Sequence, residues 1–583
     1  MKKIEILAPA GDMERLKAAI YFGADAVYFA GKRFGLRAFS TNFQEDEMEQ
    51  AITYAHEHNV KCYITVNILA HDNDFDGLKE YLEYLDQIGV DGVIVADMGI
   101  AHFVKEYTNL QLHVSTQANI TNSESAKMWV KLGAKRLVLA RELSLEEVRN
   151  IKKAVGDDID IECFCHGAMC ISYSGRCLLS NYFTKRDSNR GACAQPCRWQ
   201  YSITAKALNG EQYPIEEDEK GTYILNSKDM CLINHLKELV DAGITSFKIE
   251  GRMKSADYVY AVVSTYRRLL DENRDATGEE IGRMKEVFSR SGFTDGYFTG
   301  RISNEMLGTR TKENMQESEK IRLTRIALPT ARSPYELHRV LPLTEEPYRI
   351  LKNPPPPKKK RSARFYRVSS IPENAQRELS EIYLPLDIFD GKKANGVLFP
   401  PVIPDLELPL AKEKLQKARA AGAIHALIGN IGQIALAKEL GFRLHGDYRL
   451  NVTNSSAAAF YENIFEDLIL SPELILPQVR DIGGEKSFIV YGRLPLMTLE
   501  KPLGTDFLRD RRNAVFPVLQ EGKRSLVFNS LPIYMGDRMK LLKEAGIYNE
   551  HYIFSTEGPK ECETVLNYYQ KGLPTKREVR RIK

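Results

Sequence analysis

No apolar run in this sequence approaches the length of a membrane span, and the mean hydropathy is −0.34. We therefore expect no transmembrane segment and no membrane partner. An excess of charge is also missing, because 81 Lys and Arg residues stand against 78 Asp and Glu residues, a net charge of +3 on 583 residues. That balance neither requires nor excludes RNA as a partner, since a local basic patch is enough to contact phosphates.

Several familiar motifs are missing as well. No secretory signal opens the chain, which runs from Met1-Lys2-Lys3 directly into a strand pattern, so we expect a cytoplasmic protein without disulfides. No G-x-G-x-x-G or Walker pattern follows a predicted strand, which disfavours a nucleotide-binding open sheet. Neither a nucleophile elbow G-x-S-x-G nor an H-E-x-x-H zinc helix is present, which disfavours two common classes of hydrolase.

Short β-branched runs alternate with helical patterns in the first part of the chain, and this alternation predicts a parallel sheet covered by helices. The predicted strands are residues 4–10, 25–31, 61–67, 91–97, 110–117, 135–142, 158–167 and 245–251. Eight strands in a segment of this length fit a closed (β/α)8, TIM-like barrel. The predicted fold class is thus α/β, with a barrel over residues 1–272; an open doubly wound sheet is the disfavoured alternative.

The pattern changes after residue 272, and we predict an irregular extension and linker over residues 273–364. Four prolines at 354–357 precede the basic run Lys-Lys-Lys-Arg at 358–361. Polyproline followed by solvated charge is typical of a spacer. An RNA contact at the basic run is the less favoured interpretation.

The second half repeats stretches of the first half in the same order. Residues 112–126 (LHVSTQANITNSESA) resemble residues 444–458 (LHGDYRLNVTNSSAA), so that Asn119 corresponds to Asn451. Two further pairs follow, residues 136–151 with 467–482 and 223–244 with 526–547. Ordered repeats indicate a duplicated block. We therefore predict a second, degenerate barrel-like module over residues 365–583, without a metal because it has no cysteine-rich loop.

Six of the nine cysteines lie in one stretch, residues 162–200, which leaves the predicted seventh strand. Four of them fall in a segment rich in Gly, Ser and Asn, where a buried apolar role is unfavourable: Cys170, Cys177, Cys193 and Cys197. Four thiolates suit structural zinc or an iron-sulfur cluster. The gaps of six, fifteen and three residues favour the cluster over zinc, whose ligands pair at shorter spacings. Unrelated free thiols and a disulfide are the alternatives.

The same stretch carries a long signature. Its residues stand in the order and spacing of the peptidase U32 family signature: Glu162, Phe164, Gly167, Ala168, Met169, Cys170, Gly175, Cys177 and Ser180. The resemblance extends through LAPAG (7–11), GLRAFSTNF (35–43) and KIEGRMKS (248–255), and so covers roughly the first half of the chain. Members of this family are iron-sulfur hydroxylases of tRNA, ribosomal RNA or a quinone precursor, and others are described as collagenase-like proteases.

The resemblance implies a [4Fe–4S] cluster, with zinc as the alternative, held by the four loop cysteines. It also implies prephenate-dependent hydroxylation of a pyrimidine in RNA, with tRNA favoured over 23S rRNA. In a barrel the chemistry lies where strands end. We therefore predict catalytic roles for Glu162, His166 and Glu250, and substrate binding by a second set of residues: Arg37, Asn67, Gln117, Asn119, Lys248 and Arg252.

Within the second set, Arg37, Lys248 and Arg252 are the cations suited to clamping the carboxylates of prephenate. Aromatic residues of the cysteine segment offer a stacking platform for a base, although packing beneath the metal loop is equally compatible. A U32-type peptidase and a metal-stapled binding scaffold are the competing functions. Against a cysteine peptidase, Cys165 and His166 are neighbours on a strand and should point to opposite faces. The sequence leaves the oligomeric state open.

Overall fold

The chain forms two compact units, each built on a barrel of parallel strands. The computed structural model describes residues 4–36, 42–199, 201–202, 217–218, 221–222, 225–287, 292–308 and 360–582. The first unit comprises Met1–Ile68, Gly77–Ala96 and Phe103–Thr344, and the second comprises Leu69–Asp76, Asp97–His102 and Glu345–Lys583. None of the described helices has the length and apolar character needed to cross a bilayer.

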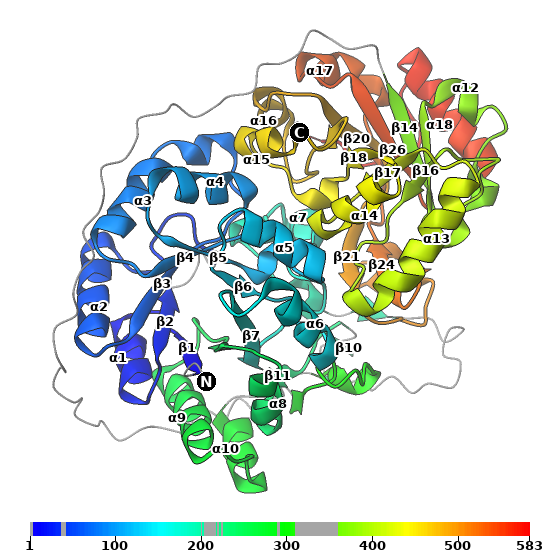
Figure 1. The fold of residues 1–583 in the computed structure, drawn as a ribbon. Helices are drawn as coiled ribbons and strands as arrows, with labels where there is room; N and C mark the ends of the chain where they lie inside the picture. Colours follow the sequence, from blue (N-terminus) through cyan, green and yellow to red (C-terminus); the bar gives the residue numbers. More distant parts are fainter. Residues whose placement is uncertain are drawn as a thin grey trace. The chain divides into compact units, whose positions relative to one another are not determined.

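The first barrel confirms the predicted TIM-like fold (Figure 1). Its strands are β1 (Glu5–Pro9), β2 (Ala26–Phe29), β3 (Lys61–Val66), β4 (Gly92–Val95), β5 (Gln111–Val114), β6 (Arg136–Val138), β7 (Asp160–Gly167) and β12 (Ser246–Ile249). Neighbours pair in parallel in the order β12-β1-β2-β3-β4-β5-β6-β7, and the pairing of β12 with β7 closes the barrel. Each of these strands matches one predicted run.

Helices connect the strands on the outside of this barrel: α1 (Met13–Tyr21), α2 (Glu45–Glu57), α3 (Leu78–Gln87), α4 (Met98–Tyr107), α5 (Ser123–Lys131), α6 (Leu145–Val155), α8 (Leu236–Asp241) and α9 (Ala256–Glu272). The start of α6 shows how local sequence sets these boundaries. Ser144 Oγ accepts a hydrogen bond from the Glu147 amide, and the Glu147 carboxylate accepts one from the Ser144 amide at 2.8 Å, which forms a capping box. Val148 and Ile151 are buried on its inner face.

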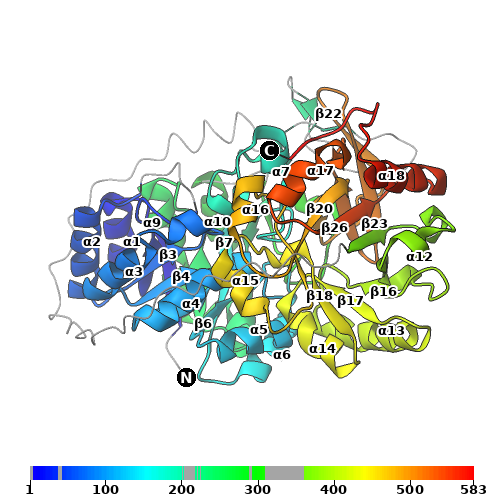
Figure 2. The same cartoon turned by 90° about the horizontal axis from the view of Figure 1, so that it is seen from above.

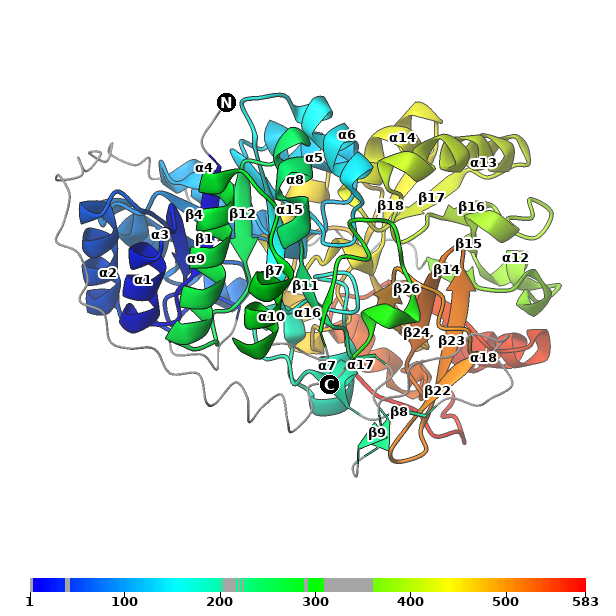
Figure 3. The same ribbon diagram turned by 90° about the horizontal axis from the view of Figure 1, so that it is seen from below.

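A long insertion separates β7 from β12 (Figure 3). It contains α7 (Leu179–Thr184), the 3-10 helices η3 (Ser188–Arg190) and η4 (Pro196–Arg198), and β11 (Asp229–Cys231). β11 pairs antiparallel with the end of β7 and in parallel with β13 (Phe293–Thr294), which follows α10 (Gly278–Val287). The cysteine segment is therefore an insertion after the seventh strand, as predicted.

The second unit confirms the predicted second barrel, which has a full set of eight parallel strands (Figure 2). These are β14 (Arg361–Phe365), β15 (Glu381–Pro385), β16 (Gly396–Leu398), β17 (His425–Ile428), β18 (Arg443–Gly446), β19 (Leu468–Ile469), β20 (Lys486–Gly492) and β26 (Asn549–Phe554). The pairings β14–β26, β26–β20 and β20–β19 complete the ring.

The outer helices of the second barrel are α12 (Ala375–Glu378), α13 (Leu408–Ala420), α14 (Ile434–Glu439), α15 (Ser455–Tyr461), α16 (Leu476–Asp481), α17 (Met539–Glu544) and α18 (Pro559–Lys571). In place of a cysteine segment, the chain after β20 forms an antiparallel sheet of β21 (Pro495–Leu499), β24 (Arg524–Phe528), β23 (Val515–Glu521) and β22 (Phe507–Asp510), in that order. β25 (Ile533–Tyr534) then pairs antiparallel with β20, as β11 does with β7.

The sequence repeat corresponds to a structural repeat. Asn119 (φ 61°) and Asn451 (φ 57°) both end a 3-10 helix in the left-handed conformation, which Asn tolerates better than most residues. Asn122 and Asn454 then cap the next helix in each copy. Of the predicted linker, prolines 354–357 lie outside the described residues. Arg361, the last residue of the basic run, lies in β14 and its Nε donates to Glu550 at 3.1 Å.

Candidate active site

The loops that follow β3 and β5 meet at the carboxyl end of the first barrel. Asn67 comes directly after β3, and its Oδ1 accepts a hydrogen bond from the Leu36 amide at 3.0 Å. Its Nδ2 lies 3.5 Å from Oγ of Ser115, which comes directly after β5. The fold therefore brings the predicted Asn67 beside the turn that carries Gln117.

Arg252 fastens the loop that follows β2. Its buried guanidinium donates from Nη1 to the Leu36 carbonyl at 3.1 Å and to Thr65 Oγ1 at 3.3 Å, and from Nη2 to Asn42 Oδ1 at 2.5 Å. The predicted substrate ligand is thus also a positioning residue for this loop. Arg37, the other cation predicted there, lies outside the described residues.

Gln117 and Asn119 belong to one tight turn. The 3-10 helix η2 (Thr116–Ala118) begins where Ser115 Oγ accepts from the Gln117 amide at 3.3 Å, and it ends at Asn119. Gly175, from the cysteine segment, packs so closely on this turn that a Cβ would collide with the Gln117 carbonyl oxygen. The cysteine segment therefore passes directly over the carboxyl end of β5.

Arg141 gives the cysteine segment a second attachment, after β6. Its Nη1 donates to the Ala168 carbonyl at 3.1 Å and its Nη2 to Ser174 Oγ at 2.8 Å. The guanidinium also lies 5.1 Å from the centre of the Phe164 ring, within cation–π range. Sequence reasoning placed Arg141 at a strand end but assigned it no role; a lone polar position there is a weak signal.

The four predicted ligands lie close to one another. Cys170 and Cys193 are exposed, whereas Cys177 and Cys197 are half-buried. Burial raises the pKa of the Cys177 thiol well above its ordinary value, and the nearby thiols of Cys197, Cys193 and Cys170 raise the pKa further. Because such charge effects weaken with distance, the other three thiols lie near enough to Cys177 to influence its ionisation. The Gln195 amide also donates to Cys193 Sγ at 3.3 Å.

Two hydrogen bonds fold the segment back on itself. Ser188 Oγ donates to the Cys177 carbonyl at 2.6 Å, and Ser180 Oγ accepts from the Ala194 amide at 3.0 Å. Within the described ranges, no three His, Cys, Asp or Glu side chains already stand as a metal-binding group. Four neighbouring thiols match a soft metal centre in their chemistry. The ligand set stays a prediction.

Aromatic residues of the cysteine segment pack on one another. Phe183 and Trp199 have ring centroids 5.3 Å apart, and Tyr182 lies 5.6 Å from Phe183. This arrangement agrees with the packing interpretation of these residues. Lys185 and Arg186 are exposed beside them, so the surface of the segment carries positive charge.

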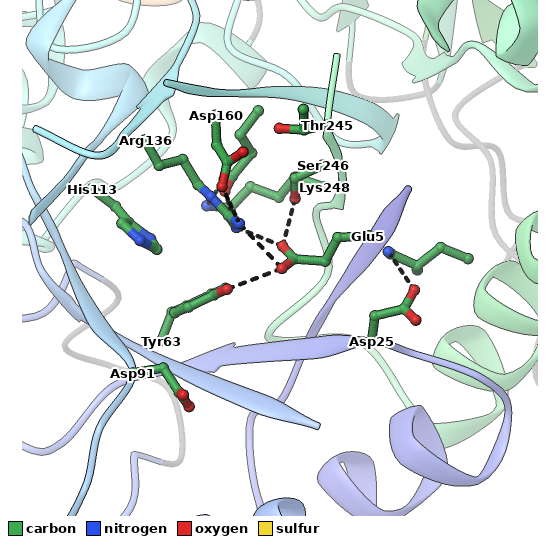
Figure 4. A network of polar contacts seen from close by, with 12 residues as sticks. Glu5, Asp25, Tyr63, Asp91, His113, Arg136, Asp160, Thr245, Ser246 and Lys248 are labelled. Carbon is green, nitrogen blue, oxygen red and sulfur yellow. Dashed lines mark hydrogen bonds and ion pairs between the residues drawn. The ribbon is translucent and has the colours of Figure 1, made fainter. Parts of the chain in front are cut away.

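A polar network around Glu5, Arg136 and Lys248 lies inside the barrel (Figure 4), and the buried Glu162 belongs to it through two hydrogen bonds. Its Oε1 accepts from Lys248 Nζ at 2.7 Å, and its Oε2 accepts from Arg136 Nη1 at 3.3 Å. Arg136 also pairs with Glu5, which accepts from the Tyr63 hydroxyl at 2.9 Å. Every charged member of this network therefore has an opposite charge beside it.

The network lies toward the amino ends of the strands. Glu5 and Arg136 are the first residues of β1 and β6. In barrels of this type, this end contributes stability and the carboxyl end carries chemistry. The geometry of Glu162 and Lys248 is thus that of a structural ion pair, and their roles in catalysis and substrate binding stay predictions. From the sequence alone, no role was assigned to Glu5 and Arg136. A charged residue within an otherwise apolar strand is a signal that could have identified both as members of a buried network.

His166 packs on the outside of β7, against α9. Its ring lies 5.2 Å from Phe293, 5.7 Å from Tyr266 and 6.0 Å from Tyr258, between ring centroids. Burial, together with the charge of Lys254, lowers the pKa of His166 to about 3, so the imidazole is neutral at physiological pH. This environment is apolar and closed, and a catalytic role for His166 stays a prediction.

Glu250 follows β12 at the carboxyl end. Its amide donates to the His166 carbonyl at 2.9 Å, which places it where β7 and β12 separate. Its half-buried carboxylate lies 3.4 Å from the Tyr28 hydroxyl. Of the three predicted catalytic residues, Glu250 is the one whose position agrees best with the catalytic end of a barrel.

Comparison with known proteins identifies relatives for the first unit. The model of peptidase family U32 matches residues 11–307. The chain is 45% identical over 277 residues to tRNA hydroxylation protein P1 of Bacillus subtilis, covering 46% of this chain and 64% of that protein. It is 38% identical over 290 residues to a 23S rRNA 5-hydroxycytidine synthase of Escherichia coli, covering 49% of this chain and 43% of that protein. It is 37% identical over 334 residues to an uncharacterized protease of Methanocaldococcus jannaschii, covering 56% of this chain and 81% of that protein.

Proposed function

The chain belongs to peptidase family U32, and we propose that within this family it is an RNA hydroxylase rather than a peptidase. The reaction we propose is prephenate-dependent hydroxylation of a pyrimidine, with tRNA favoured over 23S rRNA. The names of two relatives, one acting in tRNA hydroxylation and one a 5-hydroxycytidine synthase, support this assignment. The match covers 64% of the tRNA hydroxylation protein and 43% of the 5-hydroxycytidine synthase. The activity of this chain is therefore a proposal.

The observation that carries the proposal is the position of the cysteine segment. Gly175 packs on the turn after β5, and Arg141 ties the segment to the end of β6. Both attachments lie at the carboxyl end of the first barrel, where barrel enzymes bind their substrates. A metal centre in this segment would therefore face the substrate.

We propose that the segment holds a [4Fe–4S] cluster, with zinc as the alternative, through Cys170, Cys177, Cys193 and Cys197. The influence of the other three thiols on Cys177 and the hydrogen bond from the Gln195 amide to Cys193 support this ligand set. When bound, such a cluster supplies a centre that carries electrons or holds substrate. The chain's own contribution is to fix the segment over the barrel.

For prephenate, the cations at the carboxyl end are the proposed partners of its carboxylates. Arg252 is buried, and it donates to Leu36 and Asn42 in the loop after β2. Lys248 is paired with Glu162, so it would reach a ligand only by giving up that partner. Glu250 is the proposed acid or base at this end.

For RNA, the exposed cations of the cysteine segment are the proposed phosphate contacts. Lys185 and Arg186 lie on its surface, beside the packed aromatic rings of Phe183 and Trp199. Phosphate contacts position a nucleic acid without reading its sequence. They would hold a loop or single strand whose base enters the barrel mouth.

A peptidase is the competing function, because one relative is named a protease. A cysteine peptidase needs a thiolate beside an imidazole. Cys165 is buried, and its Sγ donates to the Lys248 carbonyl at 3.5 Å. Burial raises the pKa of Cys165 well above its ordinary value, which disfavours the thiolate.

Mass spectrometry of tRNA and ribosomal RNA nucleosides tests the proposal directly. Cells lacking the protein should lose a hydroxylated pyrimidine, and wild-type protein should restore it. Cys177→Ala should fail to restore it, whereas the matched control Cys562→Ala, a buried thiol of α18, should succeed. An unchanged nucleoside profile, together with loss of a peptide-cleaving activity, would show that the peptidase assignment is correct instead.

A further inference from the structure

The second barrel has its own polar network at its carboxyl end, beyond the residues matched by the family model. Arg364, in β14, and Asp447, directly after β18, are fully buried, and Arg449 is 8% exposed. The Asp447 carboxylate accepts from Arg364 Nη2 on one oxygen and from Arg449 Nε on the other. Two guanidinium groups thus share one carboxylate, and the trio has a surplus of one positive charge.

The guanidinium of Arg364 is not fully satisfied. Its Nε donates to His551 Nε2 at 2.9 Å, and Nδ1 of the same ring lies 2.8 Å from Ser362 Oγ. Burial and the charge of Arg364 lower the pKa of His551 well below its ordinary value, so the ring is a neutral acceptor. Arg364 Nη1 is buried and has no hydrogen-bond partner among the described residues. Leaving such a buried donor unpaired is unfavourable.

The antiparallel sheet inserted after β20 covers this end of the barrel (β24 and β23 in Figure 3). Phe528 of β24 packs edge-on against Tyr366, which follows β14, at 5.1 Å between ring centroids. Arg524 of the same strand donates from Nη1 to the Val402 carbonyl at 3.2 Å, in the loop after β16. The insertion after the seventh strand therefore covers the carboxyl end in both barrels.

This sheet brings a second unsatisfied group to the network. Glu521 ends β23, and its Oε1 is buried without a hydrogen-bond partner among the described residues. Burial, together with the negative charge of Asp387, raises the pKa of Glu521 to about 7, against the opposing charges of Arg449, Arg524 and Arg364. The carboxyl group is thus close enough to feel both arginines of the network.

We propose that this mouth of the second barrel binds the carboxylate group of a small organic monoanion, with Arg364 Nη1 as the charged donor and Glu521 as the second contact. The ligand would satisfy both groups at once, since one carboxylate oxygen accepts from Arg364 and the other accepts from the acid form of Glu521. The surplus of one positive charge matches a monoanion. The carboxyl end of parallel strands is also where barrels bind ligands.

The chemistry favours a carboxylate over phosphate. A guanidinium edge and an acid hydroxyl form a flat pair of donors, which matches a planar carboxylate. A phosphate dianion would bring a second negative charge near Asp447 in a buried place. This site is independent of the RNA hydroxylase proposal, because it uses none of the residues of the first barrel.

Isothermal titration calorimetry of the full purified chain tests the site, with sodium benzoate, sodium formate and inorganic phosphate as probes. We expect saturable binding of at least one carboxylate, and phosphate binding at least 10-fold weaker. Arg364→Gln should weaken carboxylate binding at least 10-fold, and Glu521→Leu at least 5-fold. The matched control Arg443→Gln, an exposed arginine at the amino end of β18, should bind like the wild type.

If Arg364→Gln fails to fold, Glu521→Leu decides the matter, because Glu521 lies at the end of a strand outside the barrel wall. Absence of saturable carboxylate binding would mean that water alone fills the mouth and would overturn the proposal. Equal affinity in wild type and Glu521→Leu, or tighter binding of phosphate than of carboxylate, would overturn it as well.

Discussion

Gly167 and Gly492 occupy the same position in the two barrels. Each ends the seventh strand with a left-handed backbone, at φ 105° and φ 116°. A Cβ at Gly167 would lie 2.5 Å from the Glu250 carbonyl oxygen, and one at Gly492 would collide with the Ile553 carbonyl. Only glycine allows the last strand to approach so closely while the chain leaves the barrel for its insertion.

Gly167→Ala should therefore destabilise the first unit by about 2–3 kcal/mol, because it adds a backbone clash to the strain of a positive φ. Thermal unfolding followed by circular dichroism measures the effect. The matched control is Gly133→Ala, at φ 93° but with no atom within 4 Å of the added Cβ. Equal losses in the two variants would mean that the close approach to Glu250 has no energetic weight.

Glu162→Gln should cost about 3 kcal/mol of stability, because it leaves the buried Lys248 and Arg136 with too little negative charge. The unfolding temperature and the activity per folded molecule, measured in parallel, separate a structural role from a catalytic one. If the ion pair is structural, the activity of the folded fraction stays near wild type. Glu250→Gln should show the reverse, with unchanged stability and lost activity.

Arg141→Lys should loosen the cysteine segment, since one ammonium group cannot reproduce both the bond to Ala168 and the bond to Ser174. We expect about 10-fold weaker retention of the metal centre. Iron and acid-labile sulfide per chain are the readouts, so the test does not depend on a known substrate. Arg149→Lys, on the exposed face of α6, is the control and should keep its metal.

The buried neutral His166 should make the first unit sensitive to acid. Its pKa is about 3 in the folded chain and near 6.5 when unfolded, so between these values only the unfolded state binds the proton. Stability therefore rises with pH across this window. The wild type loses free energy of unfolding between pH 7 and pH 4.5, and His166→Phe should reduce that loss by about 2 kcal/mol.

Urea unfolding at the two pH values measures that difference. His102→Phe, an exposed histidine of α4, serves as the control and should behave as the wild type. An unchanged acid response in His166→Phe would mean that other groups, and not this imidazole, set the acid sensitivity.

Several features were predictable because they depend on local patterns. The alternation of β-branched runs and amphipathic helices predicts the strands of the first barrel, and the ordered repeats predict the second. The left-handed Asn119 and Asn451 show that the repeat extends to single backbone angles. The insertion of the cysteine segment after β7 was likewise visible from its position in the chain.

The partners of polar side chains were not predictable in the same way. Glu162 pairs with Lys248 across a separation of 86 residues, and Arg252 reaches Leu36 across 216 residues. Strand alternation predicts the face of the sheet on which a side chain lies, but closure of the barrel determines which side chains it contacts there. His166 illustrates the difference, since the strand end suggested chemistry and the packing of α9 surrounded the ring with aromatic residues.

The sequence by itself therefore determined the two barrels, their repeat and the place of the cysteine segment, because periodicity and spacing act over a few turns of chain. Only the tertiary structure decided which charges neutralise one another inside the first barrel and which groups of the second barrel, such as Arg364 and Glu521, lack a hydrogen-bond partner. The physical reason is that burial and charge pairing arise between residues far apart in the chain, once closure has removed water from between them.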